Sequence, residues 1–390
     1  MDFYLSCFSL LIWIYLFFFY SRQKQGLFDL FWTNKIIFEN FCYKKTKQNL
    51  TKEKLCIVIP ARNEATNIIK TLKSILKQSF KQKFILIIDD NSIDNTAEIS
   101  KKFLKKNGFK NFRILNGKKL PEAWSGKVWA LKQAVDHLKN KNFSHFLFLD
   151  SDITMESNII KDTLGFLKSE KLIMLSLMAK LNCTLFWERL LIPSFVYFFQ
   201  KIYPFSKVNN YKKKIAAAAG GFILCRSSAF FEENLYEKIK HKIIDDCNLA
   251  KLLKEKGGIW LGLTNGVSSH RSYKNLSEIW NMVTRTAFEQ LKNSILFVIL
   301  SIFGMLIIYL FPYLNLLQQF SNFEKNEFFI NLITIFLMTF SLIPTIKFYK
   351  LSFIYYFSLP ISGFMYMCMT ANSALNYFFR DGNVWKGRKY

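Results

Sequence analysis

The sequence predicts an α/β domain with a mostly parallel sheet flanked by helices, set between N-terminal and C-terminal transmembrane helices. Three observations lead to this prediction. Between residues 51 and 290, short hydrophobic runs alternate with longer amphipathic segments, as in repeated β-α-β units. The runs 55–59 and 84–88 are almost continuously hydrophobic, which is typical of parallel strands covered on both faces. Uncharged stretches long enough to cross a membrane lie near both ends of the chain.

The first apolar stretch, Phe3–Tyr20, predicts an uncleaved membrane anchor at residues 1–22. It has no charged residue, and neither a basic leader nor a small-residue cleavage site accompanies it. An excess of Lys and Arg beside a span marks the cytoplasmic side of a membrane, so we expect the middle of the chain to face the cytoplasm. The basic residues that follow the stretch are Arg22, Lys24, Lys35, Lys44, Lys45 and Lys47.

Four strands and four helices are expected within the 51–290 domain. The sequence contains no internal repeat that would suggest another architecture. The predicted strands are 55–59, 84–88, 112–115 and 146–149, and the predicted helices are 64–78, 94–106, 126–139 and 157–168.

The C-terminal region, residues 291–390, contains three further apolar runs and a basic tail. The runs are Ile295–Pro312, Phe328–Ile346 and Leu351–Ala371, so four spans in all is the simplest count. Three C-terminal crossings would place the basic tail outside the cell, against the usual charge bias. A re-entrant hairpin in the last run, around Pro360, is therefore the alternative, and the number of crossings stays open.

The composition excludes several classes of protein. With 51% hydrophobic residues and 42 Phe, the chain can bury a core and is not disordered. The seven Cys are scattered without a C-x-x-C pair, and the four His show no H-E-x-x-H pattern, so neither a disulfide framework nor a zinc site is indicated. The net charge of +26 fits either an anionic partner or a solvated, Lys-rich surface.

Polar residues follow three of the four predicted strands, where ligands of open parallel sheets bind. The first strand leads into 60–64, the second into 89–94, and the fourth into Asp150 and Asp152. A D-x-D pair at a strand end offers oxygen ligands for Mg²⁺ or Mn²⁺ and leaves room for a diphosphate. We interpret Asp94 as an Asx-turn and helix cap, whereas Asp90 remains available for a nucleobase or ribose.

Further along the chain, several features have both a functional and a structural interpretation. Lys127, near a predicted helix start, is either a diphosphate contact or a surface residue, because the segment lacks the Walker A pattern. Asp245 and Asp246 begin another helix, and dipole capping explains one carboxylate more easily than two. The run 216–221, which includes Gly220 and Gly221, suits a ligand wall or a tight turn.

Two aromatic-rich segments suit a membrane interface. The segment 183–205 contains Trp187 and is interrupted by Pro193 and Pro204, so it is too broken to span a membrane. It is expected either to lie at the interface, where it would guide a lipid tail, or to pack in the core. The segment 276–292 resembles a second interfacial helix that leads into the next span.

The motifs taken together resemble family 2 glycosyltransferases of the GT-A fold. In order along the chain they are Pro-Ala-Arg-Asn-Glu at 60–64, Asp-Asp-Asn-Ser at 89–92, Asp-Ser-Asp at 150–152 and Asp-Asp-Cys-Asn-Leu-Ala at 245–250. Within that family the chain is most similar to the hopene-associated glycosyltransferases. The segments that carry this closer resemblance are 120–130, 186–193, 216–221, 259–264 and 385–388.

The resemblance implies a membrane-bound, metal-dependent, inverting transferase at the cytoplasmic face of a bacterial inner membrane. It would move a sugar from a nucleotide-diphosphate sugar to a lipid-like acceptor, with a hopanoid as one candidate, and it implies no nucleic-acid partner. Two departures from the family pattern concern the Q-x-x-R-W motif, of which only Arg285 is present, and Asp245, which stands where Glu is usual. Carried over to this sequence, the resemblance implies that Asp246 is the catalytic base, with Asp245 beside it, and that the divalent cation is bound by Asp152 and Asp150. The residues implied to bind the donor are Pro60, Arg62, Glu64, Asp90, Lys127, Asp150 and Arg285. Those implied to face the acceptor are Gly220, Gly221 and Trp187.

An alternative from a different class is a non-catalytic, membrane-associated protein that binds a nucleotide or an anionic lipid. Transport is a weaker alternative, because the apolar runs hold almost no ionisable residues that could mark a substrate path. Chelator-sensitive binding would favour the nucleotide sugar, whereas steeply salt-sensitive binding would favour a polyanion.

Overall fold

The computed structural model describes residues 2–20, 36–42, 48–231, 233–319, 321, 323–379, 384–385 and 388–389. The chain divides into two compact units, each built from separate stretches of sequence. The sheet unit consists of 34–182 and 205–271, and the helical unit consists of 1–33, 183–204 and 272–390. The predicted domain boundaries at 1–22, 51–290 and 291–390 stay predictions, and the compact units divide the chain differently.

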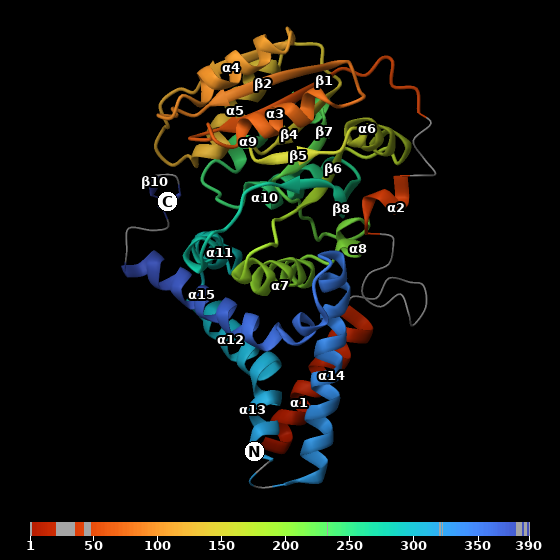
Figure 1. Cartoon of the computed structure of the whole chain (residues 1–390), viewed down its shortest axis with the longest axis vertical. Helices are drawn as coiled ribbons and strands as arrows, with labels where there is room; N and C mark the ends of the chain where they lie inside the picture. The colour runs from red at the N-terminus through yellow and green to blue at the C-terminus, as the bar shows by residue number, and fades with distance from the viewer. Residues whose placement is uncertain are drawn as a thin grey trace. The chain divides into compact units, whose positions relative to one another are not determined.

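The sheet unit is built on one mixed, eight-stranded sheet in the order β3-β2-β1-β4-β7-β6-β8-β5 (Figure 1). The strands β1, β2, β3 and β4 are mutually parallel, and β7 is antiparallel to both of its neighbours, β4 and β6. The four predicted strands are therefore confirmed, and so is the mainly parallel α/β class. The strands are β1 Leu55–Ala61, β2 Lys83–Asp89, β3 Phe112–Asn116, β4 His145–Leu149, β5 Ile153–Met155, β6 Met174–Lys180, β7 Phe222–Arg226 and β8 Ile259–Ser269.

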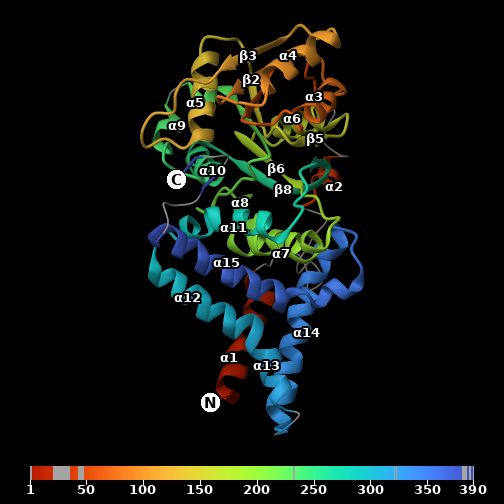
Figure 2. The same cartoon turned by 60° about the vertical axis from the view of Figure 1, so that its left-hand side comes forward.

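Helices cover both faces of this sheet, and the four predicted ones are present. On one face, Ile57 and Ile59 of β1 pack in a buried core with Ile68 and Leu72 of α3. Figure 2 shows α5 on the opposite side of the sheet from α3. The helices of this unit are α2 Phe38–Cys42, α3 Ile68–Leu76, α4 Thr96–Lys106, α5 Gly126–Leu138, α6 Ile159–Ser169, α8 Phe205–Val208, α9 Leu235–Lys238 and α10 Asp245–Lys256, with a 3₁₀ turn η2 at Ser227–Phe230.

The helical unit contains the apolar segments from both ends of the chain. Of the described helices, two are long and apolar enough to cross a membrane: the continuous stretch Ile295–Gln318 and Lys325–Phe348, each with 24 residues. The N-terminal apolar helix, Asp2–Phe18, is shorter. The elements are α1 Asp2–Ile14, η1 Tyr15–Tyr20, α7 Phe186–Ile202, α11 Leu276–Gln290, α12 Ile295–Met305, η3 Leu306–Leu310, α13 Phe311–Gln318, α14 Lys325–Phe348, η4 Phe353–Phe357, α15 Leu359–Phe379, β9 Val384–Trp385 and β10 Arg388–Lys389.

Two expectations about prolines differ from the structure. Pro193 does not interrupt the 183–205 segment, because it lies inside the continuous helix α7 and is buried there. The run 351–371 does not form a hairpin, since α15 runs unbroken from Leu359. Pro360 occupies the second position of α15, where the missing N–H breaks no intrahelical hydrogen bond.

Within the helical unit, α1 packs against α14 and lies beside α13 (Figure 1). Polar groups join these helices across very long sequence distances. Ser9 Oγ donates to Ile307 O at 3.1 Å, and Trp13 Nε1 donates to Ile308 O at 2.9 Å. Asn331 Nδ2 donates to Ser6 Oγ at 3.0 Å. The N-terminal helix is therefore a built-in member of this bundle.

Candidate active site

The loops that follow the carboxyl ends of β1 and β2 lie side by side, as the sequence predicts. The N–H of Asp90, directly after β2, donates to the carbonyl of Ala61 at the end of β1, at 2.8 Å. Arg62 then donates through Nη1 to the carbonyls of Asp90 at 2.6 Å and Asn91 at 3.1 Å. The side chain of Asp94 accepts from Ala65 N and Thr96 N, which confirms the predicted Asx-turn. These contacts place 60–64 beside 89–94.

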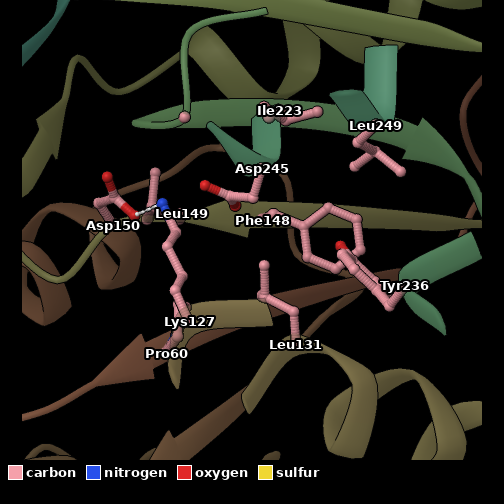
Figure 3. A pocket seen from close by; sticks show the side chains of 11 residues that line it. Pro60, Lys127, Leu131, Phe148, Leu149, Asp150, Ile223, Tyr236, Asp245 and Leu249 are labelled. Atoms are coloured by element: carbon pink, nitrogen blue, oxygen red, sulfur yellow. Dashed lines mark ion pairs between the residues drawn. The ribbon is translucent and has the colours of Figure 1, made fainter. Parts of the chain in front are cut away.

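The next carboxylate along the sheet edge, Asp150 after β4, forms an ion pair with Lys127. Lys127 is the second residue of α5, and its Nζ lies 2.8 Å from Asp150 Oδ1 (Figure 3). Burial raises the pKa of Asp150, and the charges of Asp152 and Asp245 add to this, although Lys127 opposes it. Burial alone would lower the pKa of Lys127, but Asp150 and Asp245 outweigh it and raise that pKa. Lys127 therefore stays charged at the centre of an acidic group.

Asp245 and Asp246 occupy the first turn of α10, at the predicted helix start. Asp246 Oδ2 accepts the N–H of Gly220 at 2.8 Å, and Oδ1 accepts the N–H of Cys247 at 2.7 Å. Burial, together with the charge of Asp245, raises the pKa of Asp246 to about 6, although Lys127 and the two N–H donors oppose this. A carboxylate with such a pKa is suited to accept a proton near neutral pH.

Gly220 lies close to the side chains of both Asp246 and Lys127. A Cβ at this position would lie 3.2 Å from Asp246 Oδ2 and 3.2 Å from Lys127 Nζ. The glycine therefore permits the backbone to approach both side chains. The carbonyl of the neighbouring Gly221 accepts the N–H of Asp150 at 3.2 Å, so the predicted glycine wall contacts the sheet edge directly.

A pocket lies between α5, β4, β7 and α10. Figure 3 shows Lys127 and Asp150 pointing toward each other on one side and Asp245 projecting over Phe148. Tyr236 also lines the pocket; its side chain is almost fully buried, and its hydroxyl makes no hydrogen bond within the part of the chain that the structure describes. The lining residues are Pro60, Lys127, Leu131, Phe148, Leu149, Asp150, Gly220, Ile223, Tyr236, Asp245 and Leu249.

A second ion-pair group contains Arg271, an arginine that belongs to none of the sequence motifs. Arg271 Nε donates to Asp152 Oδ2 at 2.9 Å, and Arg271 Nη2 donates to Glu64 Oε1 at 2.7 Å. Ser269 Oγ also donates to Asp152 Oδ2, at 3.0 Å. Burial would raise the pKa of Asp152, but Arg271 and Ser269 lower it. The only signal in the sequence is a basic residue two positions after a long hydrophobic strand, β8.

The carboxylates fit a divalent cation that is shared with substrate phosphates. Asp150 and Asp152 each keep a second carboxylate oxygen outside these ion pairs, and oxygen is the ligand that Mg²⁺ and Mn²⁺ prefer. Asp152 also raises the pKa of Asp150, so negative charge is in excess here. Among the described residues, no group of three or more His, Cys, Asp or Glu side chains could hold a metal by itself.

The structure groups the predicted site residues unequally. Pro60, Lys127, Asp150, Asp245 and Gly220 line one pocket. The other predicted residues of the sheet unit do not line that pocket. Asp246 adjoins it through its hydrogen bond with Gly220. Asp152 and Glu64 both form ion pairs with Arg271, and the Asp90 side chain is buried. Trp187 on α7 and Arg285 on α11 belong to the helical unit, where Trp187 packs beside Leu190 and Leu191.

The mixed sheet with acidic strand ends defines an α/β protein of the GT-A-like class. A mannosyltransferase from Pyrobaculum calidifontis, solved in complex with GDP-Man and Mn²⁺, superposes with a TM-score of 0.56 at 11% identity, over 96% of this chain and 99% of that one. That likeness concerns the fold alone, and it confirms the predicted fold. Residues 56–232 match the family model described as Glycosyl transferase family 2. The chain therefore carries a family 2 glycosyltransferase domain, as its motifs predicted.

Two curated proteins resemble parts of this domain. The 4,4'-diaponeurosporenoate glycosyltransferase of Staphylococcus haemolyticus is 29% identical over 118 residues, which are 30% of this chain and 28% of that protein. The poly-beta-1,6-N-acetyl-D-glucosamine synthase of Staphylococcus epidermidis is 31% identical over 106 residues, which are 27% and 23%. The match thus spans about a quarter of each relative's length. The resemblance to the hopene-associated subgroup stays a prediction.

Proposed function

We propose that this protein is a membrane-anchored, inverting glycosyltransferase that moves a sugar from a nucleotide-diphosphate sugar to a lipid-like acceptor. The observation that carries the proposal is the group formed by Lys127 of α5, Asp150 after β4, and Asp245 and Asp246 at the start of α10, two of which lie within the family 2 match at 56–232. A charged amine, an anionic pair and a carboxylate with a raised pKa are the groups that sugar transfer needs.

The donor would bind along the edge formed by the ends of β1, β2 and β4. The loops 60–64 and 89–94 are tied together there by Arg62 and would hold the nucleoside. Lys127 would contact the diphosphate, since its ammonium already lies within the acidic group that faces the pocket. Asp150 and Asp152 would hold a divalent cation, which supplies positive charge to the leaving diphosphate. The mannosyltransferase structure that was solved with GDP-Man and Mn²⁺ supports the expectation of a nucleotide-sugar donor and that of a divalent cation.

Asp246 would act as the general base on the acceptor hydroxyl. Its carboxylate is oriented by two backbone N–H groups, from Gly220 and Cys247, so its remaining lone pairs have fixed directions. Because its pKa is about 6, the side chain is mostly ionised at pH 7 and can accept a proton. Attack by the deprotonating hydroxyl on the face of the sugar opposite to the diphosphate would invert the anomeric carbon.

The apolar helices of the helical unit support a membrane location and a lipid-like acceptor. The two candidate spans, Ile295–Gln318 and Lys325–Phe348, support an integral position in a bacterial inner membrane, with the sheet unit in the cytoplasm. We expect the acceptor to be a membrane lipid with a free hydroxyl, such as a hopanoid, a polyprenyl compound or a diacylglycerol. One relative is named for 4,4'-diaponeurosporenoate and another for a polysaccharide, so the acceptor needs an experiment.

The test uses the full chain, purified in detergent and supplied with Mg²⁺ or Mn²⁺, a panel of UDP- and GDP-sugars and these three acceptor classes. Release of nucleoside diphosphate and the mass of the glycosylated lipid are measured, with EDTA as the metal-free arm. Asp246→Asn should lower turnover by about 100-fold or more, the usual contribution of a general base, while nucleotide binding is retained. The matched control is Asp136→Asn, since Asp136 lies on the exposed side of α5 in ion pairs with Lys132 and Lys139.

Two outcomes of this test would contradict parts of the proposal. Equal turnover by wild type and Asp246→Asn would remove Asp246 from the role of base. Chelator-sensitive binding of a nucleotide sugar without transfer to any acceptor or to water would instead favour the non-catalytic binding protein.

A further inference from the structure

We infer that Arg271 is the arginine that contacts the donor's β-phosphate. This inference rests on the proposed function and assigns a residue that neither the sequence motifs nor the family match identifies. Arg271 belongs to the sheet unit and ends the segment after β8, directly beside the acidic strand ends. Its guanidinium spans the two carboxylates of Asp152 and Glu64, which come from the ends of β4 and β1.

The two carboxylates hold Arg271 in a fixed orientation. The distances are 2.9 Å from Nε to Asp152 and 2.7 Å from Nη2 to Glu64, both within the range of charge-assisted hydrogen bonds. Glu64 is itself fixed, because its other oxygen accepts from Asn67 Nδ2 at 2.8 Å and its N–H donates to Thr96 Oγ1 at 2.9 Å. An arginine held in this way loses little side-chain entropy when it binds a ligand.

Arg271 also keeps donors and an open side for a ligand. A guanidinium has five N–H donors, and the two ion pairs use one on Nε and one on Nη2. The Arg271 side chain is 38% exposed, whereas those of Asp152 and Glu64 are 13% and 3% exposed. The accessible part of this ion-pair group is therefore the guanidinium of Arg271. The geometry of a guanidinium edge matches two phosphate oxygens.

This assignment changes the expected role of Glu64. Its side chain is buried, and its two carboxylate oxygens already accept hydrogen bonds from Arg271 and Asn67. Glu64 is therefore a positioning residue that orients Arg271, instead of a direct contact to the nucleoside. The diphosphate would lie between the Arg271 edge and the Lys127 ammonium, since their partners Asp152 and Asp150 are two residues apart after β4.

The experiment compares nucleoside diphosphates with monophosphates by calorimetry on the full chain in detergent. Wild type, Arg271→Gln, Arg271→Lys and the control Arg113→Gln are titrated with UDP, UMP, GDP and GMP. Arg113 is a matched control because it is an exposed arginine on the edge strand β3. Arg271→Gln should weaken binding of the preferred diphosphate by about tenfold or more, the size expected for one hydrogen bond to an ionised group, and leave its monophosphate unchanged.

Three further results bear on the inference. Unchanged monophosphate binding shows that the variant site is folded, and Arg271→Lys should retain part of the diphosphate affinity because it keeps the charge without the planar fork. All titrations are made with Mg²⁺ present, and the loss should persist at saturating Mg²⁺; a loss that a higher Mg²⁺ concentration removes would show that Arg271 acts through the metal ligand Asp152, and the direct contact would be wrong. Equal affinities of wild type and Arg271→Gln for the diphosphate would overturn the inference while leaving the proposed function intact. A wild-type protein that binds no nucleoside diphosphate would overturn both.

Discussion

Replacement of Glu188 by alanine should strongly destabilise the helical unit. Glu188 is the third residue of α7 and is fully buried, and its carboxylate accepts several hydrogen bonds. Oε2 accepts from the N–H groups of Thr184 and Leu185, each at 2.9 Å, and from Thr184 Oγ1 at 3.2 Å. Oε1 accepts from the N–H of Tyr273 at 2.7 Å and from Ser272 Oγ at 3.0 Å. One carboxylate therefore joins the start of α7 to the segment that leads into α11.

The size of the effect follows from these contacts. A hydrogen bond to an ionised group contributes about 1.5–3 kcal/mol, and the five bonds share one carboxylate, so their contributions overlap. We expect Glu188→Ala to lower the free energy of unfolding by about 3–5 kcal/mol, as is usual when one partner of a buried charged network is removed. For a unit of this size, that corresponds to a drop of roughly 6–20 °C in melting temperature. Glu188→Gln should recover little, because its NH₂ group would face N–H donors.

The assay is thermal unfolding of the detergent-solubilised chain, followed by intrinsic fluorescence, with Arg189→Gln as the control. Arg189 is the exposed neighbour of Glu188 on the same helical turn. Burial would raise the pKa of Glu188, but the N–H groups of Leu185, Tyr273 and Thr184 lower it. A lowered folded-state pKa means that the stabilisation is present above the ordinary Glu pKa and is lost as the pH falls, so wild type and Glu188→Ala should converge in acid. A melting temperature of Glu188→Ala within about 2 °C of wild type at pH 7 would refute this account.

Three other predictions concern the site and its scaffold. Because the pKa of Asp246 is about 6 and the ionised form is the base, kcat/KM should fall about tenfold for each pH unit below 6 and level off above 7; a flat pH profile would contradict this. Gly220→Ala should lower kcat without changing the melting temperature, since the added methyl group would meet Asp246 Oδ2 and Lys127 Nζ at 3.2 Å. Gly262→Ala should instead lower the free energy of unfolding by about 1–3 kcal/mol, because its Cβ would lie 2.0 Å from Trp260 Cη2; normal thermal stability would show that β8 can shift.

The parallel half of the sheet was predictable because each of its strands is a continuous apolar run followed by polar residues. The runs that became β1 and β2 begin and end within two residues of the predicted positions. The other half was not foreseen, and the reason is topological. β7 pairs with β4 and with β6, so its place depends on partners far away in the sequence. No local pattern records an antiparallel insertion of this kind.

The site shows the same division between local and distant information. Asp150 and Asp246 could be selected from the sequence because a motif and a helix start mark them. Arg271 and Tyr236 could not, because the groups that they contact are distant in the sequence and meet them only in the fold. The prediction that Pro193 interrupts the 183–205 segment was wrong for a related reason. A proline disfavours a helix interior by about 3 kcal/mol, but burial of the surrounding α7 side chains outweighs that local cost.

The contacts of the first helix have a consequence for biosynthesis. Ser6 and Asn331 are 325 positions apart, yet they are hydrogen-bonded, and Trp13 is bonded to a carbonyl 295 positions away. A ribosome therefore releases the opening helix long before its partners exist: Ser9 and Trp13 must wait for the carbonyls of η3, and Ser6 must wait for Asn331 of α14. A chain that stops before α14 would leave Ser6 without the hydrogen bond from Asn331, and one that stops before η3 would also leave Ser9 and Trp13 without their native acceptors.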